Sequence, residues 1–171
     1  MKSQIIHLAF CGFMGAGKST IAALTAIELS LPLFNSDKEI EARLGLNINE
    51  IFCRYGEEKF RIAEAEELKK ALNTQAPQVI DLGGGAPVVP HNFALLKEKA
   101  HIIYLAAPLE TCLRRLARSN DRPLLKQDIK NIQKLYSERA FCYESLADIT
   151  LDASRPKVEL VRQACEYYIN L

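Results

Sequence analysis

Short apolar runs with almost no polar interruption recur along the chain, and stretches with the residue spacing of amphipathic helices lie between them. Such runs are typical of parallel strands that are covered on both faces, because neither face then needs polar residues. The strands predicted in this way are Ile5–Cys11, Leu33–Asn35, Val79–Leu82, His101–Ala106 and Asp148–Leu151. The alternation of strand and helix predicts an α/β fold with three α/β/α layers around a five-stranded parallel sheet.

The stretch from residue 38 to residue 72 has a helical pattern that is longer than one crossover helix requires. Gly45 and Gly56 interrupt this pattern and divide it into two short helices and a longer one, Glu57–Leu72. We predict a helical substrate-binding insertion here, because long excursions between strands often carry contacts to a substrate.

Composition and charge narrow the class of protein. A chain of 171 residues with 49% hydrophobic content suits one domain, residues 1–171. Lys and Arg number 22 against 21 Asp and Glu, so no overall field attracts nucleic acid or an anionic membrane. Five cysteines form an odd set without CxxC spacing, which favours reduced thiols in a cytoplasmic protein. No signal peptide or membrane span is expected, and the balanced charge favours a monomer.

A complete P-loop, Gly12–Thr20, follows the first predicted strand and precedes a helix-favouring stretch. Its glycines let the backbone turn so that successive N–H groups and the start of a helix point at phosphate oxygens. Lys18 is expected to reach the β- and γ-phosphates, and the Ser19 hydroxyl to ligate Mg²⁺. The alternative is a glycine-rich turn that happens to precede a lysine.

A polar, basic segment, Ser119–Lys126, follows the helix predicted at Leu109–Ala117. We predict a mobile lid over residues 119–128 that brings Arg122 onto a transferring phosphoryl group. An ordinary solvated loop is the alternative.

Two further groups stand where predicted strands end. Asp37 follows the second strand, and the carboxyl ends of parallel strands face the ligand crevice of an open α/β sheet. The alternative for Asp37 is an N-cap of the next helix. Gly83, Gly84 and Gly85 follow the third strand, where they favour a close approach of the backbone to a ligand over a flexible turn.

Arg61 lies on a predicted helix that is rich in Glu, and this pattern alone favours a solvated surface side chain.

Taken together, the motifs resemble those of the shikimate kinase family, in the nucleoside-monophosphate-kinase structural group, from the first strand to the final helix. The motifs that carry the resemblance are the P-loop Gly12–Thr20, Asn35-Ser36-Asp37 with Ile40-Glu41, Gly56-Glu57-Glu58 with Phe60-Arg61 and Glu64, Gly83-Gly84-Gly85, Arg122-Pro123-Leu124-Leu125, and Glu138-Arg139-Ala140 with Tyr143. Each later motif is weak alone, whereas their order and spacing are specific.

The resemblance implies transfer of the ATP γ-phosphoryl group to the 3-hydroxyl of shikimate. It assigns the shikimate carboxylate to Arg61 and Arg139, whose guanidinium groups match a planar carboxylate. It assigns the ring hydroxyls to Asp37, as acceptor and candidate general base. Backbone N–H groups of Gly83, Gly84 and Gly85 would contact the same substrate.

The resemblance also assigns supporting roles. Glu64 would orient Arg61, with a surface i, i+3 pair as the alternative. Lys18 and Arg122 would stabilise charge on the transferring group. Phe52 and Phe60 would wall the shikimate pocket or, equally, form the core of the insertion. The residues expected at ATP are Gly15, Ala16, Gly17, Lys18, Ser19, Thr20, Arg115, Arg122 and Arg155.

The chain departs from the family pattern at Asn35, where the family usually has an aspartate that helps to bind Mg²⁺. An amide contributes no charge to a cation site. Asp81, at the end of the third strand, occupies the position expected of a Walker B carboxylate. We hypothesise that Asp81 replaces part of the missing charge through a water of the Mg²⁺ shell.

Two other functions compete with this prediction. A P-loop kinase for another polyol acid, such as gluconate, would not require Arg61, Arg139 and the three glycines together. A nucleotide-binding module that has lost phosphotransfer through Asn35 would bind ATP without releasing ADP in response to shikimate.

Overall fold

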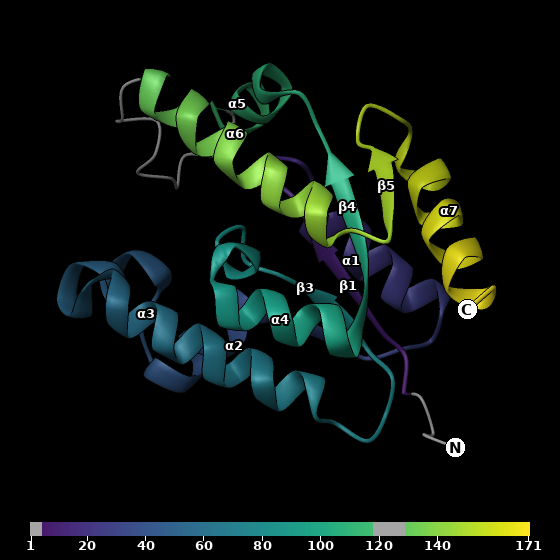
Figure 1. Cartoon of the computed structure of the whole chain (residues 1–171), viewed down its shortest axis with the longest axis horizontal. Helices are drawn as coiled ribbons and strands as arrows, with labels where there is room; N and C mark the ends of the chain where they lie inside the picture. Colours follow the sequence, from purple (N-terminus) through teal and green to yellow (C-terminus); the bar gives the residue numbers. More distant parts are fainter. Residues whose placement is uncertain (1–4, 118–128) are drawn as a thin grey trace.

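The computed structural model describes residues 5–117 and 129–171, and within them five parallel strands form one sheet (Figure 1). The sheet order is β2-β3-β1-β4-β5, with β1 at the centre. The strands are β1 (His7–Cys11), β2 (Leu33–Asn35), β3 (Val79–Asp81), β4 (Ala100–Ala106) and β5 (Ile149–Asp152). Every residue of β1 is buried, as its continuous apolar run predicts for a central strand. The predicted five-stranded parallel sheet is therefore confirmed.

Helices cover both faces of this sheet (Figure 1). α1 (Lys18–Glu28) and α7 (Lys157–Ile169) pack together on one face. α4 (Pro90–Lys99) and α6 (Ile129–Leu146) lie on the other face, and α5 (Leu109–Ala117) lies beyond the carboxyl end of β4. The predicted three layers are confirmed. No helix in these described ranges is long and apolar enough to cross a membrane.

The predicted insertion consists of α2 (Ser36–Leu44) and α3 (Ile48–Leu72), beside α4 (Figure 1). These helices bury a small apolar cluster of their own, made by Ile40, Ile51, Phe60 and Ala63. The rings of Phe52 and Phe60 lie 4.6 Å apart against it, so they form the core of the insertion. Gly56 breaks the helix as predicted, with φ of 76° and ψ of 175°, so α3 consists of two helical segments that meet at a kink.

The start of α2 differs from the expected one. Asn35 is the N-cap, and its side-chain oxygen accepts a hydrogen bond of 2.9 Å from the Lys38 N–H. Asp37 therefore lies in the first turn of α2, and the alternative of an Asp37 N-cap is wrong. A carboxylate in the first turn is still favoured by the helix dipole.

Two local features were not predicted. The N–H of Ser154, in the turn between β5 and α7, donates to the Asp152 carboxylate at 2.9 Å, and α7 begins after Pro156 without a side-chain cap. A short 3₁₀ turn, η1 (Ala86–Val88), follows the three glycines and was not predicted. The predicted lid, with Arg122, lies outside the described residues.

Candidate active site

The P-loop joins β1 to α1 in the geometry that an anion site requires. Gly15 has φ of 79°, and a methyl group there would lie 2.6 Å from the carbonyl oxygen of Cys112 in α5. Gly17 has φ of 100° and is the N-cap of α1, so the cap position has no side chain that could hydrogen-bond the first helical N–H groups. The N-terminus of α1 is therefore open towards the loop, as phosphate binding requires.

Lys18 and its neighbours lie at this helix start. Lys18 is 9% exposed, and its Nζ donates to the carbonyl oxygen of Phe13 across the loop at 3.4 Å. Ser19 and Thr20 are exposed. The structure therefore places the ammonium group and both hydroxyl-bearing residues on one short segment at the carboxyl end of β1.

Of the three arginines predicted at ATP, the two that the structure describes occupy different surroundings. Arg115 Nη1 donates to the carbonyl oxygen of Ala16 at 2.8 Å, and its Nη2 donates to that of Ala153 at 3.1 Å. Arg115 thereby ties the P-loop to the turn after β5. Arg155 is 59% exposed, with a loose ion pair to Asp152 at 3.8 Å.

The carboxyl ends of β2 and β3 bring Asn35 and Asp81 side by side, because these residues are partners in the strand register. Asn35 Nδ2 donates to Asp81 Oδ2 at 2.6 Å. Asp81 is 3% exposed. Burial raises the pKa of Asp81, while Lys18 and the hydroxyl of Ser19 oppose the rise. Asp81 therefore lies against the P-loop.

The same pair tests whether a Mg²⁺ ion fits this site. Asp81 Oδ1 is buried and has no hydrogen-bond partner at normal geometry among the described residues. Mg²⁺ prefers oxygen ligands and commonly uses one or two protein oxygens together with phosphates and water. An orphaned carboxylate oxygen beside the Ser19 hydroxyl fits that requirement.

The three glycines form the centre of a second group of side chains. A methyl group on Gly83 would lie 2.8 Å from Asp37 Oδ1 and 3.1 Å from Glu64 Oε1. One on Gly84 would lie 3.4 Å from Arg139 Nη1, and one on Gly85 would lie 2.7 Å from Arg61 Cζ.

Each of these glycines therefore leaves room for a charged side chain that the sequence had assigned to the substrate. Asp37 comes from α2, Arg61 from α3 and Arg139 from α6. The glycine segment thus brings together three predicted residues that are far apart in the sequence.

Arg61 is held in this group by a buried carboxylate. Its Nη1 lies 2.7 Å from Glu64 Oε2, and the Glu64 side chain is only 1% exposed. Its Nη2 lies 3.1 Å from Glu57 Oε1. Burial alone would lower the pKa of Arg61, but the two glutamates outweigh it and the pKa is raised. The alternatives of a solvated Arg61 and a surface i, i+3 pair are both wrong.

Opposing effects act on the pKa of Glu64. Burial raises its pKa, Arg61 opposes the rise, and the nearby Asp37 adds to it. Burying the Glu64 carboxylate costs desolvation free energy, and in return it fixes the Arg61 guanidinium. Such a pair serves to position the guanidinium more than to stabilise the fold.

Two residues near the glycines were quoted in the sequence motifs without a role. The Tyr143 hydroxyl donates to the carbonyl oxygen of Gly84, and Tyr143 is fully buried. The Ser36 hydroxyl accepts from the N–H of Gly83 at 2.7 Å. The backbone of the glycine segment is therefore fixed from two sides, and only the place of Ser36 and Tyr143 within the motifs could have indicated this.

The glycine segment also meets the P-loop. A methyl group on Gly84 would lie 3.7 Å from the carbonyl oxygen of Gly12. The Arg139 guanidinium lies over the ring of Phe13 in the P-loop, with 6.0 Å between Cζ and the ring centroid. The predicted phosphate site and the predicted carboxylate-binding arginines therefore adjoin one another.

Comparison with known proteins decides the family. The family model described as shikimate kinase matches residues 14–169. This chain belongs to the shikimate kinase family. It is accordingly an ATP-dependent phosphotransferase, and the predicted family is confirmed.

Individual relatives agree with this family. A shikimate kinase of Thioalkalivibrio sulfidiphilus is 39% identical over 169 residues, which cover 97% of this chain and 88% of that protein. A shikimate kinase from Acinetobacter baumannii, solved in complex with shikimate, superposes with a TM-score of 0.86 at 31% identity. The superposition covers 99% of this chain and 95% of that one. A gluconokinase from Sinorhizobium meliloti has a TM-score of 0.61 at 15% identity and shares the fold alone.

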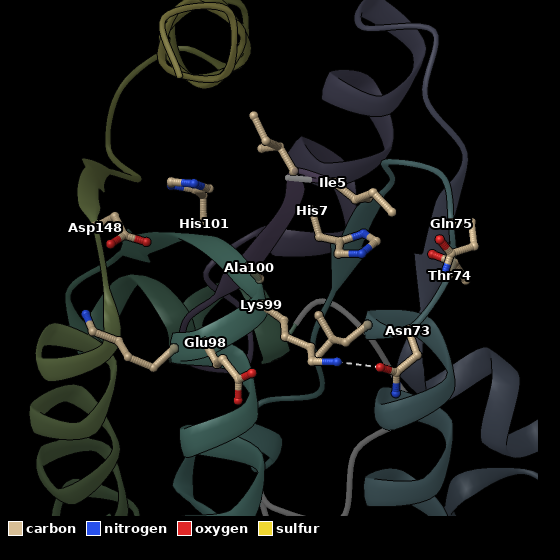
Figure 2. Close-up of a pocket in the computed structure, with 13 residues that line it drawn as sticks. Ile5, His7, Asn73, Thr74, Gln75, Glu98, Lys99, Ala100, His101 and Asp148 are labelled. Carbon is tan, nitrogen blue, oxygen red and sulfur yellow. Dashed lines mark hydrogen bonds between the residues drawn. The ribbon is translucent and has the colours of Figure 1, made fainter. Parts of the chain in front are cut away.

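A cavity of about 690 Å³ lies at the end of the sheet opposite the P-loop (Figure 2). It opens at the amino ends of β1 and β4, and none of the predicted site residues that the structure describes lines it. Figure 2 shows the ring of His7 and the hydrogen bond from Lys99 to Asn73 in this cavity. This cavity is therefore not the candidate active site, which is formed by the side chains around the P-loop and the three glycines.

Proposed function

We propose that this chain transfers the γ-phosphoryl group of ATP to the 3-hydroxyl of shikimate and releases shikimate 3-phosphate and ADP. The observation that carries the proposal is the group of Asp37, Arg61 and Arg139 around three glycines that adjoin the P-loop. Transfer between two bound substrates requires the donor and acceptor sites to be neighbours, because positioning supplies much of the catalysis.

At the acceptor end, we assign the shikimate carboxylate to Arg61 and Arg139. A guanidinium group binds a planar carboxylate through two parallel hydrogen bonds, and Arg61 is already oriented by the buried Glu64. Asp37 then binds the ring hydroxyls as a hydrogen-bond acceptor and is the candidate general base. The N–H groups of Gly83, Gly84 and Gly85 are further donors to this substrate.

At the donor end, we assign the triphosphate to Gly15, Ala16, Gly17 and the start of α1, with Lys18 at the transferred group. Ser19 would ligate Mg²⁺ directly and Asp81 would hold it through a water of its shell, and bound Mg²⁺ neutralises charge on the phosphates. Thr20, Arg115 and Arg155 are further nucleotide contacts in this proposal. Arg122 completes it from outside the described residues.

We infer that the chain works as a monomer in the cytoplasm with these two small substrates and without nucleic acid. The nearly balanced charge supports the absence of a polyanionic partner. The five cysteines are all free, as a reducing compartment favours. Gel filtration of the purified protein tests the monomer.

A coupled assay of ADP release tests the reaction. With ATP and Mg²⁺ present, we expect shikimate to stimulate ADP release, while gluconate and water leave it at background. Stimulation by gluconate instead would make the chain a kinase for a different polyol acid. Binding of ATP without shikimate-dependent ADP release would make it a nucleotide-binding module.

A further inference from the structure

Asn35 uses both ends of its side-chain amide. Its Oδ1 accepts a hydrogen bond of 2.9 Å from the N–H of Lys38 and so caps α2. Its Nδ2 donates to Asp81 Oδ2 at 2.6 Å. One side chain therefore links the start of α2 to the carboxylate at the end of β3.

An aspartate at position 35 could make only one of these two hydrogen bonds. Asp and Asn are about equally good N-caps, so the bond from Lys38 would survive. An ionised carboxylate has no hydrogen to donate, and its second oxygen would face Asp81 Oδ2 at hydrogen-bond distance. Asp81 is 3% exposed, so water cannot screen the repulsion between two such carboxylates.

The bond to Asn35 also determines which oxygen of Asp81 is left over. Oδ2 is occupied by the amide, whereas Oδ1 is buried without a hydrogen-bond partner at normal geometry among the described residues. The carboxylate lies beside Lys18 and Ser19 of the P-loop. A buried acceptor without a donor is costly unless a cation or a water that hydrates one completes it.

We propose that Asn35 is a positioning residue that fixes Asp81 so that Oδ1 serves the cation accompanying the nucleotide. Asn35 and Asp81 thus form one amide–carboxylate pair across β2 and β3, which tolerates exchange of its members but not two carboxylates. This inference rests on one part of the proposed function, the binding of a nucleotide and its cation at the P-loop. It does not depend on shikimate as the acceptor.

The first test measures thermal unfolding in EDTA without nucleotide, in the wild-type chain, Asn35→Asp, Asp81→Asn and the exchanged double variant. We expect Asn35→Asp to lower Tm by about 5 °C or more, because a charge-assisted bond becomes a repulsion. The exchanged variant should return to within about 2 °C of the wild type, since donor and acceptor are only interchanged. An unchanged Tm in Asn35→Asp, or effects that simply add in the double variant, would overturn the pairing.

The second test measures Mn²⁺ binding to the ADP complex by electron paramagnetic resonance, without shikimate. We expect Asp81→Asn to weaken Mn²⁺ binding about tenfold or more, and the exchanged variant to stay weak, because its carboxylate then caps α2 and the oxygen left over at position 81 belongs to a neutral amide. Asn35→Ser is the matched control, because serine keeps a neutral cap but is too short to hold Asp81. It should weaken Mn²⁺ binding about threefold, as expected for lost positioning without a change of charge.

Unchanged Mn²⁺ affinity in Asp81→Asn would remove the cation from the proposal. Unchanged affinity in Asn35→Ser would show that Asn35 does not position Asp81. Neither measurement uses shikimate, so a failure of shikimate-dependent ADP release would leave both results interpretable and would count against the proposed function alone.

Discussion

The donor end and the acceptor end of the site are built in different ways. The donor end is one continuous segment, Gly12–Thr20, in which backbone N–H groups, Lys18 and Ser19 follow one another in the sequence. The acceptor end collects Asp37, Arg61 and Arg139 from three helices around the three glycines.

This difference determines how each end responds to change. Donor-end groups act directly on the phosphates, so a substitution there removes one interaction. Acceptor-end groups hold one another, since Arg61 depends on both Glu64 and the empty space at Gly85. A change at the acceptor end is therefore expected to act on shikimate through a neighbouring side chain, and the two ends should be separable by kinetics.

The largest effect is expected at Lys18. Lys18→Met keeps the length of the side chain but removes the cation that the proposal places on the transferring phosphoryl group, so kcat should fall about 10³-fold. Binding of shikimate, measured by calorimetry without ATP, should stay within about threefold because it belongs to the other end. A comparable loss of shikimate affinity would show that the two ends are not independent.

Arg61 is the corresponding test of the acceptor end. Arg61→Lys replaces a guanidinium that is paired with buried Glu64, and we expect the KM for shikimate to rise about 100-fold, with the KM for ATP nearly unchanged. Arg43→Lys is the matched control. Arg43 also pairs with a glutamate of α3, at 3.0 Å from Glu67, but it is not at the glycines. A similar rise of KM in both variants would mean that the effect comes from the fold of the insertion.

The two ends also differ in how well the sequence predicts them. The P-loop was predicted in full because its function depends on adjacent residues and on backbone conformation, which glycine spacing encodes directly. The apolar runs likewise predicted the five strands.

The sequence pattern could not predict side-chain contacts that depend on how the helices and strands pack together. Whether Asn35 or Asp37 caps α2 depends on which side chain reaches Lys38, and the bond from Asn35 to Asp81 exists only because β2 and β3 are neighbours in register. The burial of Glu64 has the same origin. The spacing of Arg61 and Glu64 left a surface i, i+3 pair open as an alternative, whereas packing around the glycines leaves the Glu64 side chain 1% exposed.

Gly85 tests the dependence of Arg61 on empty space, with a smaller effect. Its φ of −93° and ψ of −18° are open to alanine, so Gly85→Ala causes no backbone strain. The new methyl group would lie 2.7 Å from Arg61 Cζ and must displace the guanidinium. We expect the KM for shikimate to rise about tenfold with kcat less affected.

Gly84→Ala is the control for this substitution. Its methyl group would lie 3.4 Å from Arg139 Nη1, where a slight movement relieves the contact, so a rise in KM below about threefold is expected. Equal effects of the two substitutions would indicate that the glycines act through their N–H groups and not by leaving room for the arginines.

The smallest expected effect concerns the pH dependence of stability at Glu64. Burial raises the pKa of Glu64 above its ordinary value of 4.5, so between the two values the folded chain holds a proton that the unfolded chain has lost. The contribution of Glu64 to the free energy of unfolding therefore grows as the pH falls through the raised pKa, and it shrinks as the pH rises. Glu64→Gln lacks this dependence, so the Tm of the wild type minus that of the variant should be larger at pH 5 than at pH 7, by about 2 °C or less.

A Tm difference that is independent of pH, or that is larger at pH 7, would show that attraction to Arg61 outweighs burial at Glu64. The expected result is the opposite trend, with the larger difference at pH 5. The acceptor end would then differ from the donor end in a measurable way, since its central arginine is held by a carboxylate whose ionisation costs the fold stability.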